Sequence, residues 1–355
     1  MLLAGCAHQS RTQSGYSPAA AGAITEQQSH TTALLQAVST VNDSVVWVSG
    51  HQATWVRTVD GGRTWVPGAM TGPDSALEFR DVEAVSATTA YLLAAGPGER
   101  SRIYKTSDAG GSWRLQFLNR DPAAFYDCFA FWDGTHGIAV SDAVRGRMIV
   151  IRTDDGEHWS PVAEEGMPAA LPGEGSPAAG GTCLTARGRA RAWFGTEPHA
   201  RVYRTDDRGR RWAAATTPIV TGEAAGVATL AFRDERHGMA LGGRLLKAQD
   251  RSDSVAAVTG DGGETWTLVN RPTFSGAVYG STVVPGVPGS FVVAGPKGLA
   301  WTGSDGRSWT SLSDSAYWAV TCASRHACWA VGPRGRITSV RFEPAVTSRH
   351  PPEEP

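Results

Sequence analysis

The sequence predicts an all-β fold: a seven-bladed β-propeller in which each blade is a four-stranded antiparallel sheet. Three observations predict it: a repeated turn motif, a regular spacing between its copies, and a composition suited to short strands joined by turns. The chain holds 42 glycines and 20 prolines among 355 residues, more than their average combined share of about 12%. Thirteen tryptophans beside only five methionines also favour strands over helices.

The repeated motif reads Thr-x-Asp-x-Gly-x-x-Trp, and it occurs at residues 58–65, 106–113, 205–212 and 259–266. Two further copies, 152–159 and 302–309, keep the Gly and the Trp but shift or lose the Asp. An Asp carboxylate can accept backbone N–H groups within a tight turn, and Gly supplies a positive φ. We therefore expect structural roles, in closing the turn and anchoring the next strand, for Asp60, Trp65, Asp108, Trp113, Asp207, Trp212, Asp261 and Trp266.

The spacing of the motif indicates one blade per copy, since the six tryptophans lie 43 to 54 residues apart. In the second unit, three alternating or apolar runs precede the turn, and a shorter run follows it. Their ranges are 82–87, 90–96, 102–107 and 113–118. Four strands per unit are typical of a propeller blade.

A seventh unit begins at 317–324, continues through 328–333 and 336–342, and lacks a fourth strand. An open blade edge would leave backbone groups unpaired. We therefore expect the residues around 18–28 to pair with the last blade and close the ring. The predicted organisation is a flexible tether at 1–22, one propeller domain at 23–343 and a disordered tail at 344–355.

The beginning of the chain carries a possible lipidation site. Leu3-Ala4-Gly5-Cys6 resembles the lipobox of bacterial lipoproteins, which implies acylation of Cys6 and export as a periplasmic or outer-membrane lipoprotein. Only five residues precede Cys6, fewer than a signal peptide needs, so we expect the true start to lie upstream. The alternative is a chance match in a cytoplasmic protein. No apolar run reaches the ~18 residues of a membrane span, so no transmembrane segment is predicted.

The turn motif is similar to the BNR or Asp-box repeats of sialidases, sortilin-type receptors and photosystem II stability/assembly factor-like propellers. The rest of each unit looks most like the assembly-factor branch, in a bacterial and non-photosynthetic form. The segments that carry this likeness are 45–50, 79–85, 124–139, 171–184 and 328–337. The resemblance covers residues 33–342 and implies a non-catalytic propeller that serves as a scaffold for a partner protein, without a cofactor.

The charge distribution favours a protein or peptide partner. Lys+Arg 33 against Asp+Glu 34 gives a net charge of -1, so we expect no nucleic-acid binding, and we expect a monomer. In a propeller, the loops between second and third strands share one face with the connections between blades. The candidate partner-binding residues on this face are Arg80, Asp81, Arg100, Arg102, Arg145, Arg147, Glu197, Arg201, Arg244 and Arg334. The alternative is that Arg is simply the usual surface cation of a chain with only three Lys.

The alternative function is an enzyme of the glycoside hydrolase or lyase type acting at the channel mouth. Its acid and base would be chosen from Asp127, Asp142 and Glu174. The Arg-Ile-Pro motif of sialidases is absent, and no glycine-rich loop has the strand and helix around it that phosphate binding requires. The repeated Asp-x-x-His-Gly at 133–137 and 234–238 is better interpreted as a turn. A sugar-binding module without chemistry is a third possibility, and no metal site is predicted.

Two cysteine pairs are candidates for disulfides. Cys322 and Cys328 flank a five-residue turn between two strands, where directly opposed residues come within disulfide reach. Cys128 and Cys183 occupy matching positions in the inner strands of adjacent units. Their bridge is possible in an oxidising compartment, and free thiols in a reducing compartment are the alternative.

Overall fold

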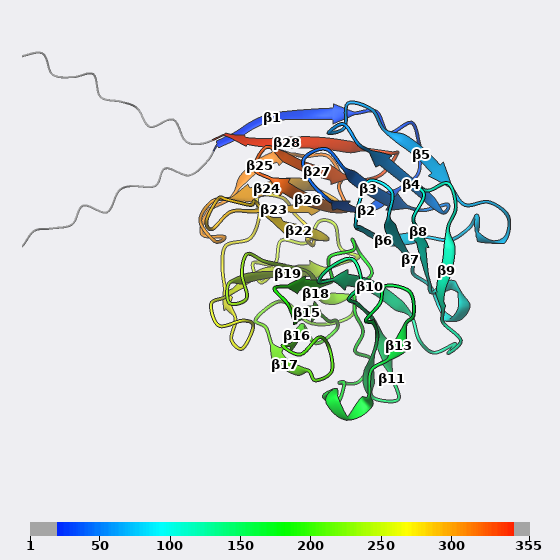
Figure 1. Cartoon of the computed structure of the whole chain (residues 1–355). Helices are drawn as coiled ribbons and strands as arrows, with labels where there is room; N and C mark the ends of the chain where they lie inside the picture. The colour runs from blue at the N-terminus through cyan, green and yellow to red at the C-terminus, as the bar shows by residue number, and fades with distance from the viewer. Residues whose placement is uncertain (1–19, 344–355) are drawn as a thin grey trace, which may run out of the picture.

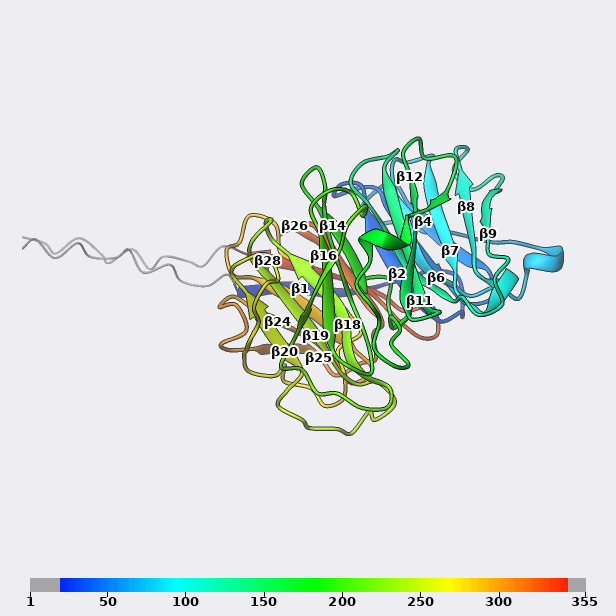
Figure 2. The same ribbon diagram turned by 90° about the horizontal axis from the view of Figure 1, so that it is seen from below.

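The short alternating runs of the chain form strands that pair antiparallel with their neighbours in sequence. The computed structural model describes residues 20–343, which form seven four-stranded sheets arranged in a ring (Figure 1). The predicted seven-bladed propeller is therefore confirmed. In the turned view of Figure 2, loops project beyond the strands on both sides of the ring. None of the helices within residues 20–343 is long and apolar enough to cross a membrane.

Blades 1 to 6 run in chain order from the centre to the rim, and the first strands of adjacent blades contact one another. Blades 1 and 2 comprise β2 (Leu35–Thr40), β3 (Val46–Gly50), β4 (Thr54–Thr58) and β5 (Val66–Ala69), then β6 (Phe79–Ala84), β7 (Ala90–Ala94), β8 (Arg102–Thr106) and β9 (Arg114–Leu118). Blades 3 and 4 comprise β10 (Tyr126–Phe131), β11 (Gly137–Val144), β12 (Arg147–Thr153) and β13 (Ser160–Pro161), then β14 (Leu184–Arg187), β15 (Arg191–Gly195), β16 (Arg201–Thr205) and β17 (Ala213–Thr216).

Blades 5 and 6 comprise β18 (Ala225–Phe232), β19 (Gly238–Arg244), β20 (Ala256–Thr259) and β21 (Thr267–Leu268), then β22 (Gly280–Val283), β23 (Phe291–Gly295), β24 (Gly298–Thr302) and β25 (Thr310–Ser313). Blade 7 comprises β26 (Ala319–Ser324), β27 (Ala327–Val331), β28 (Ile337–Glu343) and β1 (Ala20–Gln27). Three short 3₁₀ helices lie in the loops: η1 (Gly72–Asp74), η2 (Gly98–Arg100) and η3 (Glu164–Gly166).

The ring is closed by β1, which supplies the missing fourth strand of blade 7. It pairs antiparallel with β28, with Ile24 opposite Val340 and Gln27 opposite Ile337, and the two strands lie side by side in Figure 1. β1 begins at Ala20, inside the segment that the sequence assigned to the tether. Residues 1–19, with Cys6, and the tail 344–355 lie outside the described residues.

The repeated turns join the third and fourth strands of blades 1 to 6 and share one hydrogen-bond pattern. In the first turn, the Thr58 hydroxyl donates to Asp60 Oδ1 at 2.8 Å and accepts the Gly62 N–H at 3.0 Å. Asp60 also accepts the N–H of Thr64 at 2.9 Å and its hydroxyl at 2.7 Å, and these bonds lower the pKa of Asp60 to about 2. In the 302–309 copy Ser304 takes the place of the Asp and accepts the Ser308 N–H.

The tryptophan of each turn packs across the boundary with the preceding blade. Trp65 shares a buried cluster with Trp329 of blade 7, and its indole N–H donates to Gln27 of β1 at 3.1 Å. Trp113 packs against Trp47 and Trp55 of blade 1, with ring centroids about 6 Å apart. These side chains therefore join blades as well as anchoring their own strand.

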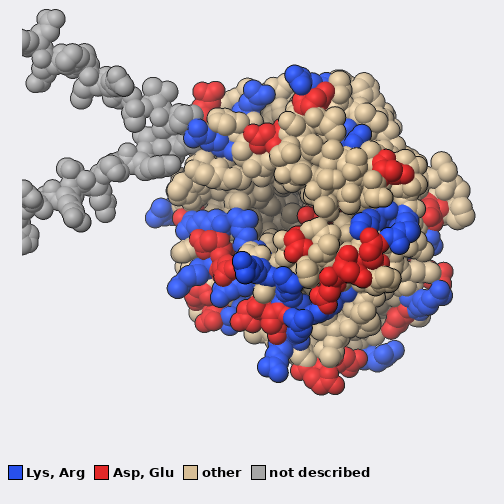
Figure 3. Space-filling model, in the orientation of Figure 1, with Lys and Arg blue, Asp and Glu red and all other residues tan. Residues whose placement is uncertain are grey.

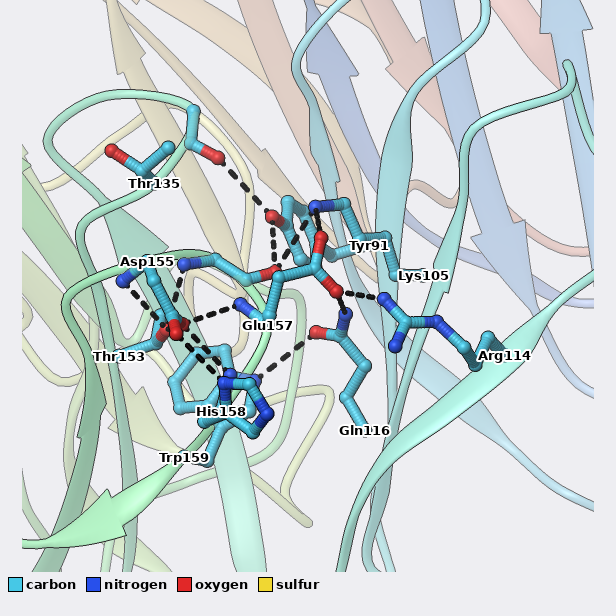
Figure 4. A network of polar contacts seen from close by, with 12 residues as sticks. Tyr91, Lys105, Arg114, Gln116, Thr135, Thr153, Asp155, Glu157, His158 and Trp159 are labelled. Carbon is cyan, nitrogen blue, oxygen red and sulfur yellow. Dashed lines mark hydrogen bonds and ion pairs between the residues drawn. The ribbon is translucent and has the colours of Figure 1, made fainter.

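Polar contacts reinforce the same boundaries, as Figure 4 shows between blades 2 and 3. Glu157, in the turn of blade 3, pairs with Lys105 at 2.5 Å and accepts from the Gln116 amide at 3.1 Å. Arg114 also pairs with Glu157. The Tyr91 hydroxyl of blade 2 lies 2.9 Å from the Gly156 carbonyl oxygen, to which it can donate. Blades 2 and 3 are thus joined by polar contacts as well as by packing.

Both predicted cysteine pairs lie at disulfide distance. Cys322 and Cys328 are direct partners in the β26–β27 ladder, with Cα atoms 4.0 Å apart. Cys128 in β10 bonds to Cys183, which directly precedes β14, with Cα atoms 6.2 Å apart. The second bridge links the inner strands of blades 3 and 4.

The burial of the turn tryptophans gives a test of the blade packing. Trp65 is only 3% exposed, so Trp65→Ala is expected to lower the free energy of unfolding by about 3–5 kcal/mol. Trp266 is partly exposed, and Trp266→Ala is expected to cost about 1–2 kcal/mol less than that. Urea denaturation of both variants measures the difference. Equal losses would contradict the role of Trp65 in closing the ring.

Candidate functional site

A pocket of about 440 Å³ lies at the centre of the ring, on the face that carries the second-to-third loops and the connections between blades. We call it the mouth pocket and this side the mouth face. Its lining side chains include Gln36, Arg80, Asp127, Asp142 and Glu197.

One position of the repeat supplies much of the lining. The β2–β3, β6–β7 and β10–β11 ladders each shift register near their start, and the extra residues are Gln36, Arg80 and Asp127. A β-bulge re-aims the side chain of its extra residue, and all three of these residues line the pocket. Tyr279 and Trp318 line it from the positions directly before β22 and β26.

The floor of the pocket is formed by the connection between blades 3 and 4. We call residues 176–181, Ser-Pro-Ala-Ala-Gly-Gly, the plug. Gln36 of blade 1 donates to the Ala179 carbonyl at 3.3 Å, and Arg80 of blade 2 donates to the Ala178 carbonyl at 3.4 Å. Only glycine fits at 180, because a Cβ there would lie 2.8 Å from the Tyr279 carbonyl oxygen of blade 6. The plug therefore lies across the centre of the ring.

Three carboxylates gather beside the plug. Asp127 is 2% exposed, and its Oδ2 has no hydrogen-bond partner among residues 20–343. Asp142 accepts the Ser176 N–H at 3.0 Å. The Glu197 backbone exchanges two hydrogen bonds of 2.9 Å with Gly175, directly before the plug. Its buried Oε2 has no partner in the described part of the chain.

The environment raises the pKa of all three groups. Burial raises the pKa of Asp127 well above its ordinary value, and the neighbouring Asp142 raises it further. Burial raises the pKa of Asp142 to about 6, and burial together with Asp142 raises the pKa of Glu197. Arg80 lowers the pKa of Asp127, but it is paired with Glu78 at 2.6 Å. The described residues thus do not compensate a full negative charge on the cluster, and its carboxyl groups stay protonated to a higher pH than usual.

The rest of the lining is largely apolar. It consists of Leu34, Phe125, Pro177, Leu245, Leu246, Tyr279 and Trp318. The Leu246 side chain is 84% exposed, the most exposed large apolar residue in the described part of the chain. An acidic floor with an apolar rim can hold a ligand that has a cationic group and an apolar body.

The partner-binding residues predicted from the sequence lie in different environments in the structure. Arg80 and Glu197 line the mouth pocket. Arg100, Arg145 and Arg334 are exposed on loops of the mouth face. Four of the remaining residues make contacts within the protein: Asp81 accepts the backbone N–H groups of Phe129 and Val82, Arg102 pairs with Asp74, Arg147 donates to the Met167 carbonyl, and Arg201 pairs with Glu174. Arg244 ends β19, and its buried Nη1 has no hydrogen-bond partner within residues 20–343.

Of the three carboxylates predicted for an enzyme, two lie in the mouth pocket and one does not. Asp127 and Asp142 both line the mouth pocket, but Glu174 does not. The side chain of Glu174 is fully buried and accepts from Arg201, Thr196 and the Leu171 N–H. This arrangement holds the connection between blades 3 and 4 against blade 4. Asp133 and Asp234 each accept the N–H of the histidine three residues later, so both Asp-x-x-His-Gly segments are turns.

The opposite face, which carries the repeated turns, has a second pocket of about 340 Å³ between blades 4 and 5. Arg204 at this pocket pairs with Glu264 at 2.9 Å, and Arg191 pairs with Glu235 at 3.4 Å. Figure 3 shows a hollow at the centre of the ring and basic and acidic side chains closely intermixed over part of the surface. Because Arg204 and Arg191 at the second pocket are paired with carboxylates, whereas Asp127 in the mouth pocket has an oxygen without a partner within residues 20–343, the mouth pocket is the better candidate site.

No group of His, Cys, Asp and Glu suited to a metal ion occurs within residues 20–343. Sequence reasoning missed the aromatic and aliphatic lining of the pocket and the plug. The available signal was positional: Gln36, Arg80 and Asp127 follow the first residue of the inner strand in three successive blades.

Comparison with known proteins supports the fold. No family model matches the chain, and no curated protein matches it. Among solved structures, "YCF48 bound to D1 peptide" has 16% identity and a TM-score of 0.64, covering 92% of this chain and 98% of that chain. "YCF48 from Cyanidioschyzon merolae" has 12% identity and a TM-score of 0.66, covering 90% and 99%. The RRP9 WD40 repeats have 13% identity and a TM-score of 0.62, covering 93% and 100%.

The pKa of Asp142 gives a test of the pocket. Asp142 ionises near pH 4 in the unfolded chain but near pH 6 in the folded protein. Above pH 6 the folded state therefore carries a charge that its site disfavours, and the free energy of unfolding is lower than at pH 4. Asp142→Asn removes this charge and can still accept the Ser176 N–H. We expect the variant to be more stable than the wild type by about 1–3 kcal/mol at pH 8 and equally stable at pH 4. Thermal and urea denaturation across this pH range check the prediction, and a difference independent of pH would contradict it.

Proposed function

We propose that this protein is a non-catalytic scaffold that binds an extended segment of a partner protein over the mouth pocket. The observation that carries the proposal is the pocket itself, in which an apolar rim with the exposed Leu246 surrounds buried carboxylates without partners in the described chain. Exposed apolar surface with a polar centre is typical of protein-binding sites.

Two further observations support a peptide-like occupant. The plug forms the floor of the pocket, so a ligand lies over the ring and can extend outward along the loops of the mouth face. A structure with the same fold carries the description "YCF48 bound to D1 peptide". We therefore favour an assembly- or stability-factor-like role of the BNR or Asp-box type.

A hydrolase is the second candidate because Asp127 and Asp142 both line the pocket with raised pKa values, as a general acid requires. Against it, Glu174 is committed to Arg201. An enzyme would lose turnover of its glycoside in Asp142→Asn. A scaffold would instead lose its partner when an apolar residue of the rim, such as Leu246, is replaced.

The compartment that we propose is the bacterial envelope, where the protein would be held as a monomer by acylated Cys6. The two disulfides support an oxidising compartment.

The envelope proposal is tested on protein isolated from the membrane fraction of the source organism. Intact mass and peptide mapping without reductant are expected to show both disulfides and a diacylated or triacylated Cys6. Free thiols at Cys128 and Cys183 in a soluble cytoplasmic fraction would contradict it.

The binding proposal is tested by amine cross-linking. Lys247 and Lys297 are exposed on loops of the mouth face, whereas Lys105, 14% exposed, is paired with Glu157. The wild type is expected to cross-link to one partner through Lys247 or Lys297, and Leu246→Asp is expected to lower the yield at least tenfold. Val59→Asp, a matched change at an exposed apolar residue of the opposite face, is expected to have no effect. Equal yields for both variants would contradict the proposal.

A further inference from the structure

We propose that the mouth pocket recognises a cationic side chain, Lys or Arg, that the partner segment inserts against Asp127, Asp142 and Glu197. This inference rests on the proposed function and names the chemistry of its ligand.

The first step concerns Asp127. Its side chain is almost completely buried, yet Oδ2 has no hydrogen-bond partner within residues 20–343. The bulge in β10 directs this side chain into the pocket. A buried carboxylate without a partner is costly, and a hydrogen-bond donor that enters the pocket removes that cost.

The second step concerns the charge around Asp127. Asp142 and Glu197 raise its pKa through their own negative charges. Within residues 20–343, Arg80 is the cation that lowers the pKa of Asp127, and its guanidinium is bound to Glu78 and to the Ala178 carbonyl. An anionic ligand would oppose ionisation of these carboxyl groups still further, and a neutral ligand would not reverse their raised pKa values. A cation provides both donors and charge.

The third step concerns the shape of the rim. Tyr279 and Trp318 pack edge to face, with ring centroids 5.5 Å apart, and the Tyr279 hydroxyl donates to the Leu245 carbonyl at 2.5 Å. Aromatic and aliphatic walls suit the methylene stem of Lys or Arg, while the head reaches the carboxylates. The pocket therefore fits a long cationic side chain better than a free metal ion.

Arg80 of blade 2, His51 of blade 1 and Tyr279 of blade 6 line the pocket with the cluster, and Glu78 pairs with Arg80. Burial lowers the pKa of His51, so this side chain adds little positive charge above pH 6.5. A bound cation favours the ionised form of these carboxyl groups, so it competes with the protons that they hold at low pH. Because Asp142 has a pKa of about 6, binding is expected to strengthen as the pH rises from 5 to 8.

The test uses three capped tripeptides, acetyl-Leu-X-Leu-amide, with Arg, Lys or the uncharged norleucine at X. Calorimetry or NMR titration with the whole protein at pH 8 is expected to show binding of the Arg or Lys peptide at least tenfold tighter than that of the norleucine peptide. The comparison of Arg with Lys identifies the preferred cation. Asp127→Asn is expected to weaken this binding at least tenfold, and Glu197→Gln at least threefold.

The control is Glu223→Gln, which removes an exposed carboxylate from the connection before β18 on the same face and is expected to leave binding unchanged. Thermal melts establish that each variant is folded. Equal binding of the norleucine, Arg and Lys peptides, or no effect of Asp127→Asn on binding, overturns the inference.

Two outcomes distinguish this inference from the proposed function. If Leu246→Asp abolishes cross-linking but no cationic peptide binds, the scaffold function stands and the cation site fails. If cationic peptides bind but Leu246→Asp leaves cross-linking intact, the scaffold proposal fails.

Discussion

The structure depends on burial between blades, because no single four-stranded sheet can bury both of its faces. The tryptophans of the repeated turns supply this burial by lying across the boundary with the preceding blade, as Trp65 and Trp113 do. The same constraint explains β1. Without β1, the outer edge of β28 would be unpaired, and the indole N–H of Trp65 would lose its acceptor, Gln27. Closing the ring therefore satisfies a sheet edge and completes the packing of the first and last blades.

A closed ring of this kind brings one repeat position from every blade to a common centre. In blades 1 to 3 that position holds Gln36, Arg80 and Asp127, and a bulge directs each side chain toward the mouth pocket. The plug then sets the depth of the pocket. It is held at one end by the buried Glu174–Arg201 pair and at the other by the Cys128–Cys183 disulfide. The rigid ring and the anchored plug together fix the acidic cluster before any ligand binds.

The sequence was sufficient to predict the fold because its evidence is local and repeated. Four copies of the turn keep Thr, Asp and Gly at fixed spacing and two more keep the Gly and Trp, so the six copies predict six blades. The unpaired edge of the seventh unit predicts β1. The direct opposition of Cys322 and Cys328 was predictable for the same reason. The candidate site was only partly predictable. Arg80, Asp127, Asp142 and Glu197 were identified as candidates, but the sequence did not show that they share one pocket.

The plug and the pocket depend on contacts between distant segments that no local pattern encodes. Residues 176–181 look like an irregular connection, and only in the folded ring do Gln36, Arg80 and Tyr279 surround them. Likewise, the sequence does not show that Arg201 and Glu174 pair with one another, as they do in the structure. The carboxylates of Asp127 and Glu197 show the reverse. The fold buries Asp127 Oδ2 and Glu197 Oε2 and gives neither atom a hydrogen-bond partner within residues 20–343. A ring with tryptophans across its blade boundaries can tolerate this local cost, and a ligand with the opposite charge would recover it.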